Sequence, residues 1–237
     1  VQPGSSSIIL NRVTGGNVSK ILGTLSANGN VILVNPNGVF FGKNSRVDVG
    51  GIIASTADIK NRDFMAGRMN FSVAGKADAK IVNKGNITVR DAGVAAFVAP
   101  GVDNQGVIVA HMGKVSLAAG NTFTIDLYGD GLVHLAVGDK VSKDVFGDGS
   151  ALVKNSGRIT ANGGRVLITA NAAKNVVDNV INMSGVVQAR GVRQNADGSI
   201  DLLGNGGGVD VSGTLDASNT HGKGGRVTVT GDRVRLR

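Results

Sequence analysis

A five-residue phrase that begins with glycine recurs along this chain of 237 residues, and its spacing limits the fold more than any other feature of the sequence. The phrase runs glycine, polar residue, β-branched residue or leucine, polar residue, then valine or alanine. It begins at Gly85, Gly106 (imperfectly), Gly157, Gly185 and Gly213, and the last three copies start 28 residues apart. Fixed spacing of this size is typical of a solenoid, in which each repeat stacks on its neighbours.

A second glycine-led phrase with a similar pattern follows behind the first. It begins at Gly113, Gly164, Gly198 and Gly225. Both phrases alternate apolar and polar residues with a period of two, which is typical of a strand with one buried face, and turn residues bound them. Several short strands in each repeat, without a helix between them, predict an all-β parallel β-helix whose coils stack at about 4.8 Å.

The alternation also predicts which side chains point into the β-helix. We expect the inward positions to be Ile87, Val89, Ile159, Val166, Ile168, Val187, Leu215, Val227 and Val229, and the outward ones to include Lys114, Arg158, Thr160, Arg165, Arg226 and Thr228. Ile159, Val187 and Leu215 occupy the same place in successive copies, so they should form one inward ladder. The composition agrees, because a chain with 37 Gly, 3% aromatic residues and no Glu forms helices poorly.

Three segments depart from the repeat. Residues 58–80 and 121–153 break the period, and we expect both to be excursions outside the β-helix. Residues 1–30 carry apolar runs but no repeat, so they are expected to form an atypical cap, because a solenoid must cover its end. With these additions, residues 1–237 form a single domain.

The second excursion carries a hairpin pattern. Alternating stretches at residues 122–128 and 132–137 flank Gly129, Asp130 and Gly131. Glycine and aspartate between two alternating stretches favour a tight turn between antiparallel strands. We therefore expect a β-hairpin here.

Charge and cysteine content exclude several classes of protein. The net charge is +8, but Lys and Arg are scattered singly and few aromatic residues are available to stack on bases, so we expect a solvated basic surface and no nucleic acid partner. The absence of Cys excludes disulfides and thiolate metal sites. No segment approaches the roughly 20 apolar residues of a membrane helix. The chain begins at Val1 without a signal peptide, which suggests a piece of a longer protein.

One turn stands out within residues 26–42. An apolar stretch at 31–34 is followed by Asn35, Pro36, Asn37 and Gly38, after which the apolar pattern resumes. Pro36 presets φ for the second turn position, the Asn35 side chain can cap the turn, and Gly38 tolerates the geometry at its exit. We expect the loss of the Asn35 cap to cost about 1 kcal/mol. Most turns of this composition have no role beyond reversing the chain.

The surroundings of this turn resemble a known family. In order, they are Asn-Arg-Val-Thr-Gly-Gly at 11–16, Ile-Leu-Gly at 21–23, Ala-Asn-Gly at 27–29, the turn at 35–38, Phe-Gly at 41–42 and Gly-Gly-Ile-Ile-Ala-Ser-Thr at 50–56. This series closely resembles the two-partner secretion domain of the filamentous-haemagglutinin family, which are large exoproteins of Gram-negative bacteria. The matching motifs lie close together over residues 2–60, whereas over residues 81–237 only the repeats are similar.

The resemblance implies a function and a site. It implies an N-terminal domain that periplasmic domains of a cognate outer-membrane β-barrel transporter recognise while the chain is extended. Outside the cell the domain then folds as a right-handed parallel β-helix and templates the following coils. The family's secretion motif falls on Asn35, Pro36, Asn37 and Gly38.

The resemblance also implies a secreted or cell-surface protein. Its downstream passenger would be an adhesin, a haemolysin or a haem-acquisition protein, with host-cell molecules as partners of that passenger. We expect no cofactor, no metal and a monomer.

Two other classes of function remain as alternatives. Parallel β-helices also include polysaccharide-degrading enzymes, but Asp201, Asp210 and Asp216 fall on different strands, so no shared catalytic groove is expected. Direct adhesion to glycans or proteins ranks second, because outward Lys and Arg would favour acidic partners.

Possible metal ligands have simpler explanations in this sequence. The Gly-Asp contexts hold Asp130, Asp139, Asp144 and Asp148, which we interpret as turn formers because no calcium-binding repeat is present. The histidines, His111, His134 and His221, lack the spacing of a zinc-binding helix motif.

Overall fold

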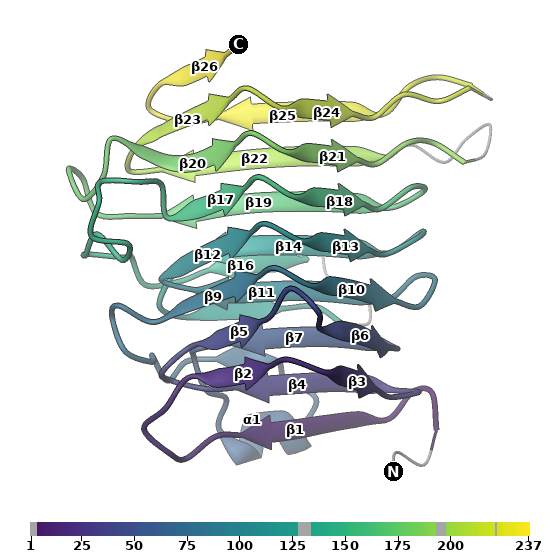
Figure 1. Ribbon diagram of the computed structural model, residues 1–237, viewed down its shortest axis with the longest axis vertical. Coiled ribbons are helices and arrows are strands. Elements are labelled where there is room, and N and C mark those ends of the chain that lie inside the picture. Colours follow the sequence, from purple (N-terminus) through teal and green to yellow (C-terminus); the bar gives the residue numbers. More distant parts are fainter. Residues whose placement is uncertain (1–3, 128–133, 193–197, 221) are drawn as a thin grey trace.

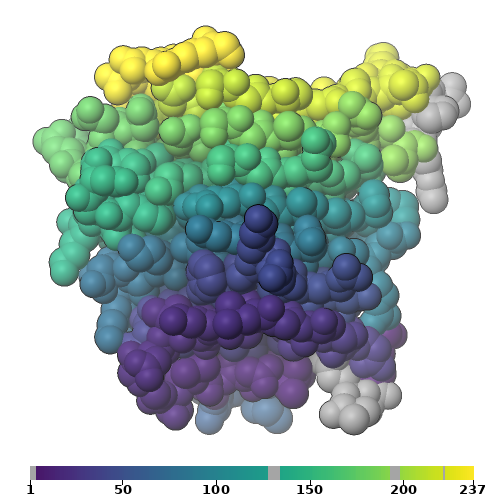
Figure 2. Space-filling model, viewed as in Figure 1, coloured from purple at the N-terminus to yellow at the C-terminus, as the bar shows by residue number. Residues whose placement is uncertain are grey.

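The computed structural model describes residues 4–127, 134–192, 198–220 and 222–237 of the chain. In these residues the chain forms a right-handed parallel β-helix, whose coils rise from the N-terminus at the bottom of Figure 1 to the C-terminus at the top. Figure 2 shows the coils as successive bands of one continuous stack. The predicted fold class is therefore confirmed.

Three parallel sheets make up the walls of the β-helix, and each complete coil gives one strand to each sheet. Sheet 1 contains β1 (Ile8–Arg12), β4 (Asn30–Val34), β7 (Gly51–Ser55), β11 (Val94–Ala99), β14 (Lys114–Ala119), β19 (Arg165–Asn171), β22 (Ser199–Asn205) and β25 (Arg226–Thr230). Sheet 2 contains β2 (Ser19–Ile21), β5 (Val39–Phe41), β9 (Lys80–Asn83), β12 (Gly101–Asn104), β17 (Val153–Asn155), β20 (Asn179–Met183), β23 (Gly208–Val211) and β26 (Val234–Leu236). Sheet 3 contains β3 (Thr24–Ser26), β6 (Arg46–Val49), β10 (Asn86–Val89), β13 (Val107–Val109), β18 (Arg158–Thr160), β21 (Val186–Gln188) and β24 (Thr214–Asp216).

The interior of the β-helix is one apolar core built from ladders of aligned side chains. Ile159 pairs in register with Val187, and Val187 pairs with Leu215, so the predicted inward ladder is confirmed. Val227 is aligned with the buried Ile200 but is itself 42% exposed, because β25 is the last strand of sheet 1.

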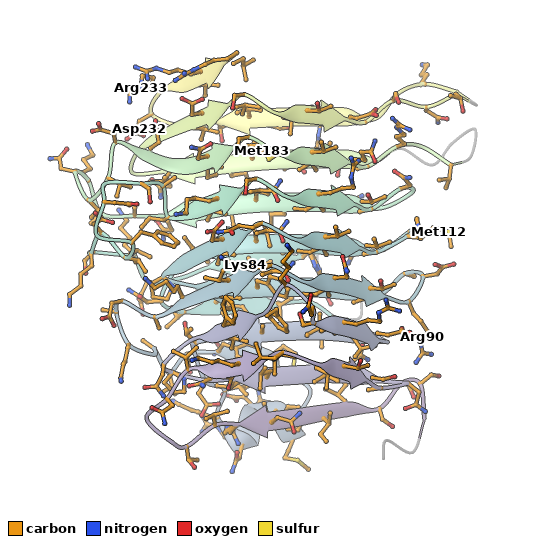
Figure 3. The ribbon with its side chains drawn as sticks, in the orientation of Figure 1. Lys84, Arg90, Met112, Met183, Asp232 and Arg233 are labelled. Atoms are coloured by element: carbon orange, nitrogen blue, oxygen red, sulfur yellow. The ribbon has the colours of Figure 1, made fainter. Side chains whose placement is uncertain are left out.

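A short polar ladder runs through this interior. Asn83 donates to Asn104 at 2.8 Å, and Asn104 donates to Asn155 at 2.6 Å. The next member is Met183, whose sulfur accepts from Asn155 and whose side chain lies within the stack in Figure 3. Because the three amides are buried, these bonds satisfy groups that would otherwise be costly to remove from water.

Close stacking of the backbone explains why glycine begins each phrase. A Cβ atom on Gly157 would overlap the carbonyl group of Gly106, and one on Gly106 would overlap that of Gly85. The second phrase repeats this arrangement, since Gly164 lies over Gly113. The two columns of glycine therefore mark corners where successive coils approach too closely for any side chain.

A second core lies outside the β-helix. A lateral sheet of three antiparallel strands, β8 (Asn70–Phe71), β15 (Phe123–Ile125) and β16 (Leu135–Val137), covers the outward face of sheet 1. Phe71 and Phe123 stack with ring centroids 4.3 Å apart. Strands such as β11, in which every residue is buried, are apolar throughout because both of their faces are covered.

The lateral sheet joins the two segments that break the repeat. The first leaves the coil after β7, forms α1 (Asn61–Met65) and β8, and returns at β9. The second leaves after β14, forms β15 and β16, and returns at β17, which begins at Val153. The antiparallel pairing of β15 with β16 agrees with the predicted hairpin, while Tyr128, Leu132 and the turn at 129–131 lie outside the described residues.

The start of the chain, where a cap is predicted, forms the first coil of the β-helix. Over the described part of residues 1–30, β1, β2 and β3 form a regular coil that pairs in parallel with the next one. Ile8 and Leu10 pack on the second core, and Ile21 and Leu25 pack on the first. The repeat is hidden here because this coil lacks the stacked glycines that mark later coils. No helix in the described residues is long and apolar enough to span a membrane.

Candidate functional site

The turn at residues 35–38 joins β4 to β5 at the corner between sheets 1 and 2 of the second coil. Gly38 N donates to Asn35 O at 3.0 Å, which closes a four-residue turn. The turn lies between two other segments of the corner. The first coil contributes residues 15–19 on one side, and residues 76–80 contribute on the other as the first excursion returns.

Asn35 is completely buried and uses its whole hydrogen-bonding capacity. Its Oδ1 accepts from Asn37 N at 2.9 Å and from Asn37 Nδ2 at 3.0 Å, as expected for a side chain that caps its own turn. Its Nδ2 also donates to Asn17 O and to Ser19 Oγ, both at 2.9 Å. An asparagine amide offers two donors and two acceptor sites, so the folded domain leaves none of them for a partner.

The other residues of the motif fix the turn to its neighbours. Asn37 Nδ2 donates to Gly15 O at 2.8 Å, and Lys76 N donates to Pro36 O at 3.0 Å. Gly38 has a φ of 113°, and a Cβ atom there would lie 2.6 Å from Lys80 O, so glycine is required for both reasons. The four residues therefore act as one clamp between coils.

This geometry corrects the expected effect of losing Asn35. The sequence indicated a local cap worth about 1 kcal/mol. In the structure, the same side chain also bonds to Asn17 and Ser19 in the preceding coil. Sequence reasoning missed these partners because 16 to 18 residues separate them from Asn35, and only the stacking of coils brings them together.

The three aspartates considered for an enzyme lie on three different sheets. Asp201 is on β22, Asp210 on β23 and Asp216 on β24. Each is paired with an arginine, at 3.6 Å, 2.7 Å and 2.6 Å respectively. Hydrogen bonds from Ser218 and Arg190 lower the pKa of Asp216 to about 2. The structure therefore does not bring these carboxylates together.

Two aspartates of the second excursion form turns through their side chains. Asp144 accepts hydrogen bonds from the backbone N–H groups of Phe146, Gly147 and Gly149, and these bonds hold its pKa below the usual value. Asp148 likewise accepts from Ser150 N at 2.9 Å. Asp130 and His221 lie outside the described residues. Among the residues that are described, no group of three acidic or histidine side chains could hold a metal ion.

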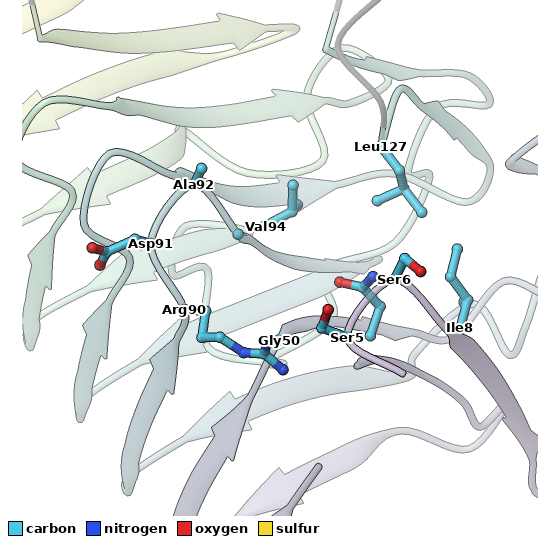
Figure 4. A pocket seen from close by; sticks show the side chains of 11 residues that line it. Ser5, Ser6, Ile8, Gly50, Arg90, Asp91, Ala92, Val94 and Leu127 are labelled. Atoms are coloured by element: carbon cyan, nitrogen blue, oxygen red, sulfur yellow. The ribbon is translucent and has the colours of Figure 1, made fainter. Parts of the chain in front are cut away.

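A cavity of about 360 Å³ lies between residues 5–8 and the turn at 90–94. Figure 4 shows Arg90 reaching toward Gly50, while Asp91 points away from it. Besides these two ionisable groups, the described lining consists of hydroxyl, amide and apolar side chains. This arrangement lacks the adjacent nucleophile and base that covalent catalysis requires.

Comparison with known families defines the class of protein. The family model for the TPS secretion domain matches residues 1–216, so the chain belongs to the family of two-partner secretion domains. These are domains of secreted exoproteins that cross the outer membrane, and the family is not an enzyme family.

Individual relatives agree with this class. The chain is similar to the crystal structure of the HMW1 secretion domain from Haemophilus influenzae, with a TM-score of 0.81 and 30% sequence identity. The match covers 100% of this chain and 59% of the HMW1 chain. A heme/hemopexin-binding protein from Haemophilus influenzae is 30% identical over an alignment of 227 residues, and the match covers 85% of this chain and 23% of that protein. Another protein of the same name, from strain Rd, is 36% identical over an alignment of 132 residues, and that match covers 53% of this chain and 15% of that protein. The chain thus spans less than a quarter of the length of either curated relative.

Proposed function

We propose that this domain directs the export of a longer exoprotein, and that the periplasmic domains of a cognate outer-membrane transporter recognise residues 35–38 and their flanking strands before the domain folds. Once outside the cell, the domain folds and templates the coils that follow. The observation that carries the proposal is the complete burial of Asn35 with all of its hydrogen bonds used within the folded domain.

The pairing of the flanking strands supports recognition of an unfolded chain. β4 lies between β1 and β7, and β5 lies between β2 and β9, so both backbone edges of each strand are already paired. A transporter that adds its own strand to these segments needs free N–H and C=O groups. The extended chain offers them, and the folded domain does not.

The topology supports a chain that stays unfolded long enough to be recognised. Neighbouring strands of each sheet are separated by a whole coil, and β5 pairs with β9 across the first excursion. Non-local pairing of this kind folds slowly because loop closure precedes any stabilising contact.

Export of matched variants tests the proposal. Asn35→Ala and Asn37→Ala, placed in the full-length precursor, should lower secretion severalfold when the transporter is co-expressed. Asn83→Ala is the matched control, because Asn83 is equally buried and its side chain is also hydrogen-bonded, but it lies outside the motif. Loss of export in Asn83→Ala to the same degree would show that domain stability, and not the motif, governs secretion.

For the exported protein as a whole, we propose a heme- or hemopexin-binding exoprotein, because both curated relatives carry that name. Binding of hemopexin to the full-length protein and not to residues 1–237 alone is the expected result. Adhesion to host molecules, display at the cell surface and a monomeric state stay predictions.

A further inference from the structure

A groove of about 320 Å³ lies on the outward face of sheet 1, where the lateral sheet ends. β16 is an edge strand of the lateral sheet and packs against β14 and β19, so it forms one wall of the groove. The polar residues of this basic groove are Lys114, Ser116, His134, Arg165, Asp201 and Arg226. Its volume is at the lower end of the range for small-molecule sites.

The register of sheet 1 places like charges side by side in this groove. Lys114 on β14 is aligned directly with Arg165 on β19, an arrangement that destabilises a pair of strands. Arg226 has Asp201 at 3.6 Å, whereas no acidic partner of Lys114 or Arg165 occurs within the described part of the chain. A bound anion would relieve this repulsion.

Two residues that line the same groove, Ser116 and His134, each carry a buried polar atom that has no hydrogen-bond partner within the described structure. These atoms are Oγ of the fully buried Ser116 and Nε2 of His134. His134 Nδ1 lies 2.9 Å from Asp126 O, which assigns the proton to Nδ1 and makes Nε2 an acceptor. Burial, helped by the charges of Lys114 and Arg165, lowers the pKa of His134 to about 4, so the imidazole is neutral at pH 7.

These groups together fit one chemical class of ligand. Two cationic side chains suit a carboxylate, and the Ser116 hydroxyl can donate to one of its oxygens. The neutral His134 Nε2 suits a hydroxyl donor on the same molecule. Leu135, Leu167 and Leu203 provide an apolar surface beside them. Sulfate would satisfy the cations, but it carries no hydroxyl hydrogen to donate to Nε2.

We propose that the basic groove binds a sugar acid, with its carboxylate between Lys114 and Arg165 and a ring hydroxyl on His134. The binding site is separate from the corner at residues 35–38, and it belongs to the folded domain after export.

Calorimetric titration of the 237-residue chain tests this site, with D-glucuronate as the probe and D-glucose and sulfate as comparisons. D-Glucuronate should bind saturably, sulfate at least tenfold more weakly, and D-glucose not measurably. Lys114→Gln and Arg165→Gln should each weaken D-glucuronate binding at least tenfold, since a hydrogen bond to a charged group is lost. Arg158→Gln is the matched control, because Arg158 is exposed on sheet 3, and it should bind as the parent does.

Thermal melting provides a second readout that does not depend on heat of binding. D-Glucuronate should raise the melting temperature of the parent and of Arg158→Gln, but not of the two groove variants. Three results would overturn the proposal: no saturable binding of D-glucuronate, equal binding of sulfate, or full binding by both groove variants in their folded form.

Discussion

The Asn35 side chain holds two coils of the β-helix together. Its amide closes its own turn and also bonds to the coil below, so it contributes twice to the folded state. The same burial removes it from any partner that meets the folded domain. A requirement for Asn35 in export would therefore have to arise before folding.

Asn35 and Asn37 should differ in their effect on stability. Asn35→Ala leaves a buried cavity and unpaired partners in two coils, and we expect it to lower the free energy of unfolding by about 3 kcal/mol. Asn37 is partly exposed, so Asn37→Ala should cost about 1 kcal/mol. Urea unfolding of both variants measures the difference, and equal losses would contradict the inter-coil role of Asn35.

His134 should make the domain less stable in mild acid. Its pKa is about 4 in the folded domain, below the usual 6.5, so the unfolded chain binds a proton that the folded one does not. Stability that is present above pH 6.5 is therefore lost as the pH falls toward 4. Burial of the ring and the charges of Lys114 and Arg165 lower this pKa, whereas Asp126 raises it.

His134→Asn isolates this effect, because its amide can still donate to Asp126 O but does not titrate. Between pH 7 and pH 5 the parent should lose more of its free energy of unfolding than the variant does. Parallel curves for the two proteins, from urea unfolding at each pH, would contradict this role of His134.

At the scale of strands and turns, two columns of glycine allow successive coils to stack closely. Each glycine column occupies a corner where one coil lies directly on another. This requirement produced the phrases from which the fold could be predicted. Substitution by alanine should therefore lower stability much more at a glycine within a column than at a glycine with no neighbouring atoms.

Gly157→Ala tests the column, because the new Cβ would overlap the carbonyl of Gly106. We expect the free energy of unfolding to fall by about 3 kcal/mol, since the backbone on both sides must shift. Gly16→Ala is the control, because nothing lies within 4 Å of a Cβ there and it should change stability by less than about 0.5 kcal/mol. Similar effects of the two substitutions in denaturant unfolding would contradict the account.

The strands that could be predicted from the sequence are those in which apolar and polar residues alternate as their buried and exposed faces do. The strands after Gly157, Gly185 and Gly213 alternate because their outward faces meet solvent. The first coil was not recognised, because its strands lack stacked glycines. The lateral sheet was predicted only as a hairpin, because the pairing of β8 with β15 joins segments about 50 residues apart and leaves no local signal.

The candidate site was predictable only in part. Its turn, the cap by Asn35 and the positive φ of Gly38 follow from the local residues. Its burial and its contacts with Asn17, Ser19 and Lys80 depend on which coils lie above and below. The basic groove was missed for the same reason, because register across strands aligns Lys114 with Arg165.

At the scale of the whole molecule, the two cores lie on opposite faces of sheet 1. The inner core continues from coil to coil, so it can extend into whatever sequence follows, as a template would require. The outer core packs the lateral sheet against β4, β7, β11 and β14. Folding of the first coils therefore buries Asn35 and pairs both backbone edges of β4 and β5.

The most direct measurement of this central claim is an order-of-addition capture experiment with the transporter's periplasmic domains. The chain, unfolded in urea, is diluted into buffer that already contains these domains, or they are added after refolding is complete. We expect capture only in the first order, and weaker capture of Asn35→Ala than of Asn83→Ala. Equal capture of the refolded chain would contradict it, because Asn35 is then buried and fully hydrogen-bonded.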